Sequence, residues 1–179
     1  MKQLIPLLLL LSTLSSNAQN NPSKDSRHII LVDGIYTKAK IETTVNLPYG
    51  ASYIHKFNYS TWGIAIGYRY SIISNLRAGI NATYFSYHYV NNTNAFMLGV
   101  HIEAPFPITD DLLIGPNLNL SYAPFDNPSN AEFTPGASLG IMYKINKLMA
   151  VNLEPGFRYY FQKNNGYEIP IHCGLRILL

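Results

Sequence analysis

The chain has 179 residues, a formal net charge of +3, 13% charged residues and 13% aromatic residues, among them 14 Tyr. So small a net charge does not favour nucleic acid or an anionic membrane surface as a partner. The single cysteine, Cys173, excludes an intramolecular disulfide framework and a cysteine-based metal site.

The N-terminal segment has the pattern of a secretory signal peptide. A short basic start at Met1-Lys2-Gln3 precedes an almost wholly apolar run from Leu4 to Leu14, and Ser16-Asn17-Ala18 supplies small residues before a cleavage site. The apolar run is too short to cross a bilayer as a helix. The residue that follows is Gln19 and not Cys, so a lipoprotein is not expected. We therefore expect a signal peptide at 1–18, a polar lead-in at 19–28 and one folded domain at 29–179.

Strict alternation of apolar and polar residues marks the rest of the chain, and a period of two is the signature of a β-strand. The clearest segments are 62–71, 76–84, 96–106, 112–122, 133–144, 151–161 and 169–179. A weaker segment lies near 30–36. There we expect Ile30, Val32 and Tyr36 to point outward, because the opposite phase would turn Asp33 toward an apolar medium.

The connections between these segments alternate in length. The short ones are 73–75, 109–111 and 146–147, and the longer ones are 43–60, 91–94, 125–132 and 163–166. Short turns at one end and longer loops at the other are typical of outer-membrane barrels. The pattern predicts an all-β fold, an eight-stranded antiparallel up-and-down transmembrane β-barrel with both termini at the short-turn end.

The two faces of the predicted strands differ in charge. The apolar faces of the seven clear segments carry no Asp, Glu, Lys or Arg, whereas the opposite faces carry the charges and many glycines. A soluble barrel would turn its charges outward, so we expect the apolar face to meet lipid and the charged face to fill the lumen. The predicted polar network of the lumen comprises Arg69, Arg77, His101, Glu103, Glu154, Arg158, His172 and Arg176.

Aromatic residues on the apolar face are expected to form two girdles at the membrane interfaces. The predicted outer girdle comprises Trp62, Tyr84, Tyr122, Phe133, Tyr159 and Phe161, and the predicted inner girdle comprises Tyr70, Phe106 and Tyr143. A soluble secreted β-barrel that binds an apolar ligand remains an alternative.

On these features the chain resembles the small eight-stranded outer-membrane barrels of Gram-negative bacteria, the OmpA/OmpX type. The C-terminal residues 172–179 are similar to the strand that the barrel-assembly machinery recognises, although Ile177 and Leu179 stand where aromatics are usual. The resemblance implies a place in the cell outer membrane in contact with its lipid, a lead-in on the periplasmic side and a porin-like, non-enzymatic protein. Its role would be an envelope scaffold or adhesion of its surface loops to an unknown partner.

A hairpin loop at Asn164–Gly166 would set the register of the last two strands. Glu154 would then face Arg176, and Arg158 would face His172. Opposite charges across a ladder stabilise each other, and in a narrow lumen they avoid an unpaired buried charge.

An enzymatic role finds little support in the sequence. Neither a Gly-x-Ser-x-Gly motif nor a Gly-rich phosphate loop is present, and the histidines lack the spacing of metal ligands. We therefore expect no catalytic, cofactor-binding or metal-binding residues. Two alternatives stay open: a proton-transfer site of Glu154, His172 and His101, and a barrel enzyme that acts on lipid. The barrel lipid A deacylases carry His-x-Ser, but here His172 is followed by Cys173 and Gly174.

Overall fold

The computed structural model describes residues 27–179 except 47, 51, 88–92, 124–131 and 162–163. The predicted signal peptide and most of the predicted lead-in lie outside the described residues. Within the described part, no helix has the length and hydropathy needed to cross a membrane.

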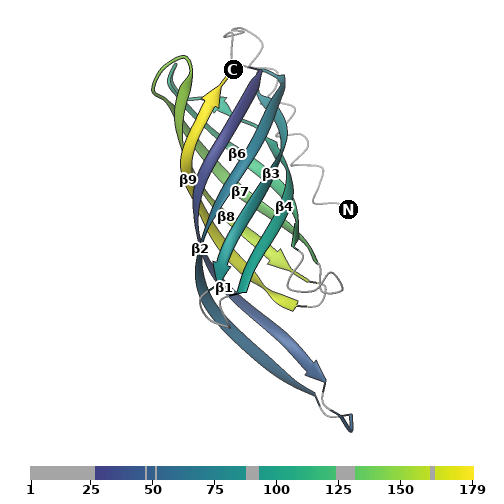
Figure 1. The fold of residues 1–179 in the computed structure, drawn as a ribbon. Helices are drawn as coiled ribbons and strands as arrows, with labels where there is room; N and C mark the ends of the chain where they lie inside the picture. Colours follow the sequence, from purple (N-terminus) through teal and green to yellow (C-terminus); the bar gives the residue numbers. More distant parts are fainter. Residues whose placement is uncertain (1–26, 47, 51, 88–92, 124–131, 162–163) are drawn as a thin grey trace, which may run out of the picture.

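The described residues form one antiparallel sheet that closes into a barrel (Figure 1). Its strands are β1 (His28–Asn46), β2 (Ser52–Ile73), β3 (Leu76–Tyr87), β4 (Thr93–Glu103), β5 (Phe106–Pro107), β6 (Leu112–Ala123), β7 (Glu132–Lys144), β8 (Met149–Tyr160) and β9 (Asn164–Leu178). Consecutive strands pair except β4 and β5, which both pair with β6, and β1 pairs with β9. The short β5 therefore completes the barrel strand that β4 begins. The predicted eight-stranded up-and-down barrel is confirmed.

Side chains alternate between the two surfaces of the sheet as the period of two requires. In β8 the exposed and buried positions alternate along almost the whole strand. In β1 the side chain of Val32 is 46% exposed and that of Asp33 is 3% exposed. The expected phase of β1 is confirmed, and Asp33 points into the barrel.

Both ends of the barrel chain lie at the short-turn end (Figure 1). The backbone N–H of Leu179 donates to the carbonyl of His28 at 2.8 Å, and that of Ser71 donates to the carbonyl of Arg27 at 2.8 Å. Strands β2 and β3 are joined at the same end by a turn at 74–75. The predicted place of the termini is confirmed for the described residues.

The prediction of a loop from Thr43 to Ser60 is wrong. Strand β1 continues to Asn46 and β2 begins at Ser52, and the ladder between them is unbroken up to the Asn46–Ser52 pair. The extra residues form a hairpin that projects from the barrel at the end opposite the termini (Figure 1). At its tip Tyr49 and Gly50 adopt positive φ angles of 84° and 80°, which suits a tight turn between twisted strands.

Five prolines occupy strand positions, of which Pro107 lies in the two-residue β5. Each of the other four lies where one of its two ladders is interrupted: Pro116, Pro135, Pro155 and Pro170. Pro116 lies between the stretches of β6 that pair with β4 and with β5, and its carbonyl accepts the N–H of Ala104 at 3.0 Å. Pro135 lies one residue outside the β7–β8 ladder, which begins at Gly136. A missing N–H is tolerated at such places because no ladder partner needs it.

Candidate functional site: a charge-balanced barrel interior

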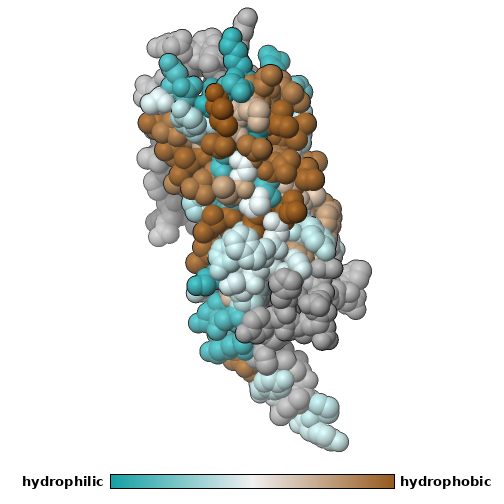
Figure 2. All heavy atoms as spheres, turned by 60° about the vertical axis from the view of Figure 1, so that its left-hand side comes forward, coloured by the Kyte–Doolittle hydropathy of each residue, from teal (hydrophilic) through white to brown (hydrophobic). Residues whose placement is uncertain are grey.

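The outer surface of the barrel carries a continuous apolar belt. Figure 2 shows a hydrophobic band bounded by hydrophilic surface at both ends. Large apolar side chains in this band are exposed, from Ile171 at 38% to Ile80 at 61%. Exposed apolar area of this extent marks a surface that meets an apolar medium.

Aromatic side chains border the belt at the positions expected of two girdles. At the loop end the rings of Tyr36 and Trp62 lie 4.7 Å apart, and those of Tyr122 and Phe133 lie 5.2 Å apart. At the turn end the ring of Tyr70 lies 5.4 Å from that of His28. The remaining predicted girdle residues also lie on the outer face: Tyr84, Phe106, Tyr143, Tyr159 and Phe161.

The structure places all eight predicted lumen residues inside the barrel, each 7% exposed or less. It adds two acidic residues to them, Asp33 and Glu168, which are 3% and 1% exposed. Four arginines and four acidic residues therefore share the described interior: Arg69, Arg77, Arg158 and Arg176 with Asp33, Glu103, Glu154 and Glu168. Equal numbers of opposite charges reduce the cost of taking each charge out of water.

Glu103 is the centre of the largest ion-pair group. Its Oε1 accepts from Nε of Arg69 at 2.8 Å and from Nη1 of Arg176 at 3.0 Å. Nη1 of Arg77 lies 4.0 Å from its Oε2. The carboxylate comes from β4 and the three guanidinium groups from β2, β3 and β9. One buried acid thus ties four strands together across the lumen.

Arg176 also bridges to a second carboxylate. Its Nη2 lies 3.3 Å from Oε2 of Glu154, and Oγ of Ser138 donates to Oε1 of Glu154 at 2.5 Å. The contact between Glu154 and Arg176 is therefore present. The predicted register, in which Glu154 pairs directly with Arg176, is wrong. In the structure Ala150 pairs with Arg176, and Glu154 pairs with His172.

The register of β8 and β9 differs from the prediction by four residues. Asn164–Gly166 does not form the hairpin loop but belongs to β9, where Asn164 pairs with Thr43 of β1. The change places Arg158 opposite Glu168 and not opposite His172. Two gains favour the observed register: more backbone pairing with β1, and an opposite charge facing Arg158.

Arg158 and Glu168 form a separate ion pair toward the loop end. Nη1 of Arg158 lies 2.8 Å from Oε2 of Glu168, and the hydroxyl of Tyr59 donates to Oε1 of Glu168 at 3.1 Å. Sequence reasoning missed Glu168, although it has the same parity as His172 and Arg176 on the last strand. That parity is the signal that could have found it.

The proposed proton-transfer residues occupy neighbouring parts of the interior. Glu154 faces His172 across the ladder, and Nδ1 of His172 lies 3.9 Å from Oδ2 of Asp33. Both ring nitrogens of His101 are buried without a hydrogen-bond partner among the described residues. In the same part of the chain, no group of three His, Cys, Asp or Glu side chains is arranged to hold a metal ion.

Among the described residues, side chains pack closely around Glu103 in the interior. A cavity beside Glu103, lined also by Arg77, Asn152 and Arg176, has a volume of about 20 Å³, which is room for about one water molecule. Close packing depends on small residues, because a Cβ at Gly79 would overlap the side chain of Arg69. The charged residues thus form a packed plug.

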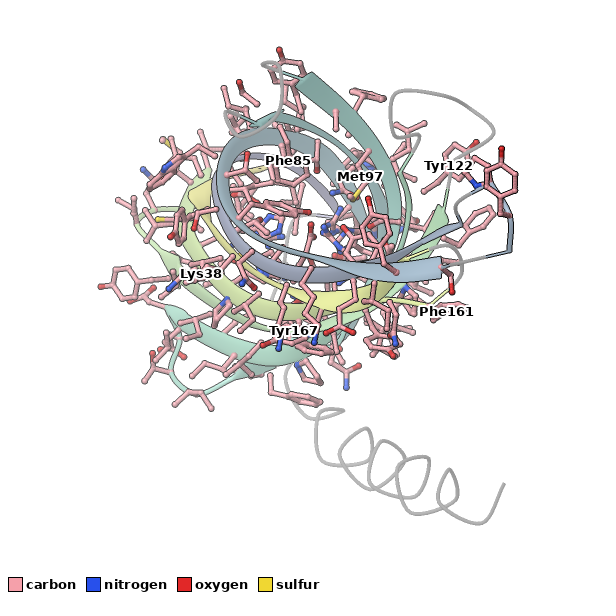
Figure 3. The ribbon with its side chains drawn as sticks, turned by 90° about the horizontal axis from the view of Figure 1, so that it is seen from below. Lys38, Phe85, Met97, Tyr122, Phe161 and Tyr167 are labelled. Carbon is pink, nitrogen blue, oxygen red and sulfur yellow. The ribbon has the colours of Figure 1, made fainter. Side chains whose placement is uncertain are left out.

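Apolar clusters lie on either side of this plug along the barrel. One gathers residues near the turn end: Ile29, Leu113, Met142, Ala150 and Leu178. The other gathers Ile35, Ala65, Phe85 and Met97 toward the loop end, and Phe85 and Met97 lie inside the ring of strands in Figure 3. These clusters add buried apolar packing on either side of the ion pairs around Glu103.

Comparison with known proteins gives a match of fold. No protein-family model matches the chain, and no curated protein does. Neisserial surface protein A matches with 16% identity and a TM-score of 0.58 over 84% of this chain and 97% of that one. The outer membrane protein OprG from Pseudomonas aeruginosa matches with 10% identity and a TM-score of 0.51 over 86% of this chain and 96% of that one. The chain therefore has the fold of the small eight-stranded outer-membrane β-barrels, as the sequence predicted.

Proposed function

We propose that the protein is an integral barrel of the outer membrane with no enzymatic activity. It is a rigid envelope scaffold that presents the β1–β2 hairpin at the cell surface to a partner. The observation that carries the proposal is the inverted distribution of polarity, with an apolar belt outside and balanced charges inside. A barrel in water has the opposite distribution.

The packed interior supports a role other than catalysis. Arg69, Arg176 and Arg158 already hold carboxylates at 2.8–3.0 Å, so their charges are used within the barrel. A cavity of about 20 Å³ admits water but no lipid or sugar substrate. These groups therefore serve stability in our proposal, and binding falls to the outer surface and the hairpin.

The hairpin supports a display role. Residues Ser52–Thr61 of β2 lie beyond its ladder with β3, which begins at Trp62, and the described pairings join them to β1. Because β1 pairs with β9 as far as Thr43, the part that β1 and β2 form alone starts at the Thr44–Ile54 pair. At about 3.3 Å per residue, its three paired positions extend roughly 10 Å beyond β9, and the tip lies beyond them. Tyr49 at the tip is fully exposed, and Tyr53 and Ile54 are 47% and 60% exposed. Exposed aromatic and aliphatic side chains on a projecting segment suit contact with a partner.

The C-terminal strand is proposed to guide assembly. Ile177 and Leu179 point outward, 39% and 59% exposed, and Leu178 points inward. Two outward apolar positions at the end of the chain are what the barrel-assembly machinery is expected to read. Replacing Ile177 and Leu179 by Ser should reduce insertion in cells, while insertion into synthetic vesicles, which needs no machinery, should change less.

The test of this function uses fractionation and surface cleavage in a Gram-negative host. We expect the mature chain in carbonate-washed outer membranes, with different mobility on gels before and after boiling. A protease site inserted after Gly50 should be cut in intact cells, whereas the same site between Asn146 and Lys147 should not. Recovery in the soluble periplasmic fraction would refute the membrane location. A change in the mass spectrum of lipid A on expression would refute the non-enzymatic role.

A further inference from the structure

A groove on the outside of the barrel lies directly beyond the outer aromatic girdle. It has a volume of about 490 Å³ and is lined by residues of β1, β2 and β9. The inward-facing Ala39 and Tyr59 adjoin six residues that point outward: Lys38, Lys40, Asn58, Ser60, Tyr167 and Ile169. Pockets that bind small molecules have volumes of roughly 300–1,000 Å³. Lys38 and Tyr167 lie on the same side of the barrel in the view of Figure 3.

The strand register arranges the groove in two rows. In the first row Lys38 lies between Ser60 and Ile169, and in the second row Lys40 lies between Asn58 and Tyr167. Residues opposite each other on neighbouring strands have Cβ atoms about 4.5–5.5 Å apart. Lys40 is therefore flanked on both sides by groups that can donate or accept hydrogen bonds, whereas Lys38 has Ser60 on one side and the aliphatic Ile169 on the other. Two cations beside neutral hydrogen-bonding groups suit a phosphorylated sugar.

The charges of the two lysines are available for a ligand. The acidic residue among the described outward side chains of β1, β2 and β9 is Glu42, and Nζ of Lys56 lies 3.2 Å from its Oε1. Behind the groove, on the interior face, Glu168 is held by Arg158 at 2.8 Å. Both nearby carboxylates thus have other cations as partners, and Lys38 and Lys40 give the groove a positive charge.

The position of the groove along the barrel identifies the source of the ligand. The row next to it on the membrane side is formed by Tyr36, Trp62 and Ile171. The hydroxyl of Tyr36 donates to Oγ of Ser60 at 3.3 Å, so its ring lies in the belt and its polar tip reaches the first row of the groove. Tyr and Trp rings mark the membrane interface, and lipid headgroups lie immediately beyond it.

We propose that this groove binds a phosphate group of a phosphorylated glycolipid in the outer leaflet. Lys38 and Lys40 bind the phosphate as point charges, and Asn58, Ser60 and Tyr167 hydrogen-bond the sugar. The site fixes a lipid against β1 and β9 at the base of the projecting hairpin. The proposal rests on the membrane location proposed above.

The test uses Trp62, the single tryptophan of the chain, which lies one row from the groove. The folded protein in zwitterionic micelles is titrated with diphosphoryl lipid A, and Trp62 emission is recorded. A Lys38→Gln/Lys40→Gln variant is the test protein, and Arg27→Gln/Lys147→Gln is the matched control. The control removes the same charge from exposed positions at the turn end. Each protein is first tested for folding in phosphatidylcholine vesicles by comparing its gel mobility before and after boiling. Failure to insert at this step would refute the proposed membrane function, independently of the lipid titration.

We expect saturable binding by the wild type and the control. The groove variant should bind about thirtyfold more weakly, which corresponds to about 1 kcal/mol for each lysine near the membrane surface. Lipid A freed of its phosphates should bind wild type as weakly as intact lipid A binds the groove variant. Equal binding by the two variants, or equal binding of the two forms of lipid A, overturns the proposal.

Two further titrations separate the possible sources of the anion. Inorganic phosphate tests a free-phosphate site, and heparin tests a soluble sulfated polysaccharide. Each anion is added at the concentration at which lipid A gives half of its full change in Trp62 emission. If either anion saturates the emission change at that concentration, the assignment to a membrane lipid is overturned.

Discussion

Charge removal at Glu103 should destabilise the barrel more than charge removal at Glu154. Glu103 accepts from Arg69 at 2.8 Å and from Arg176 at 3.0 Å, with Arg77 4.0 Å away. Glu103→Gln leaves these arginines without their shared counter-charge in a site that is 4% exposed. Breaking a buried ion pair in this way costs about 3–5 kcal/mol.

Glu154→Gln should cost less, because Arg176 keeps its 3.0 Å contact with Glu103. The variant loses the 3.3 Å contact to Arg176 and weakens the bond from Ser138. A hydrogen bond to a charged group contributes about 1.5–3 kcal/mol. The free energy of unfolding should therefore fall in the order wild type, Glu154→Gln, Glu103→Gln.

The measurement is urea unfolding of protein refolded into phosphatidylcholine vesicles, followed by Trp62 emission. The double variant Glu103→Gln/Arg69→Gln restores the balance of charges and should recover part of the loss, since coupled sites are not additive. An equal or larger cost for Glu154→Gln would show that Glu154 is the main partner of Arg176. Costs below about 1 kcal/mol for both single variants would show a hydrated interior and refute the dry plug.

Three further predictions concern the wall of the barrel. Leu153→Arg, on the outer face near the middle of β8, should cost about 2–4 kcal/mol of unfolding free energy in the same vesicle assay. Cys173 is exposed on the outer face opposite Leu153, so a lipid-soluble maleimide should label it in vesicles much faster than a charged maleimide, and equal rates would contradict a lipid-facing position. The third prediction uses a Cys173→Ser background. There Tyr159→Cys/Tyr167→Cys should form a disulfide on oxidation, because Tyr159 faces Tyr167 across the ladder. Tyr159→Cys/Ile171→Cys should not form one, and the reverse result would support the register expected from the sequence.

The sequence determined which face each residue occupies but not its partner across the ladder. A period of two and the absence of charges on one face are local properties, and they assigned Arg69, Glu103 and Arg176 to the interior without any knowledge of pairing. Pairing depends on where a turn closes. The Asn164–Gly166 stretch has good turn residues, yet it pairs with β1 because the neighbouring strand extends that far. Only the neighbour's length, a non-local fact, could decide between the two registers.

The contacts between charged residues in the lumen could not be predicted from the sequence either, because they too depend on non-local strand positions. The contact of Glu103 with Arg69 and Arg176 joins β4, β2 and β9, which are far apart in the chain. Its existence depends on the tilt of the strands, which lets long side chains meet across the lumen. Balance of charge was a further usable signal: the predicted network has four arginines and two glutamates, and the inward-facing Asp33 and Glu168 supply the two missing acids.

The error at Thr43–Ser60 has one physical origin. On β1 the outward residues change from Val32 and Tyr36 to Lys38, and on β2 the outward Trp62 is likewise followed by polar residues toward the tip. The backbone ladder between β1 and β2 continues past this change to the Asn46–Ser52 pair, because hydrogen bonding between two strands does not require lipid. A strand ends where its partner ends, whereas an apolar face ends where the bilayer ends. On β1 and β2 the strands continue beyond the end of the apolar face. The groove and the projecting hairpin lie on this additional length of strand.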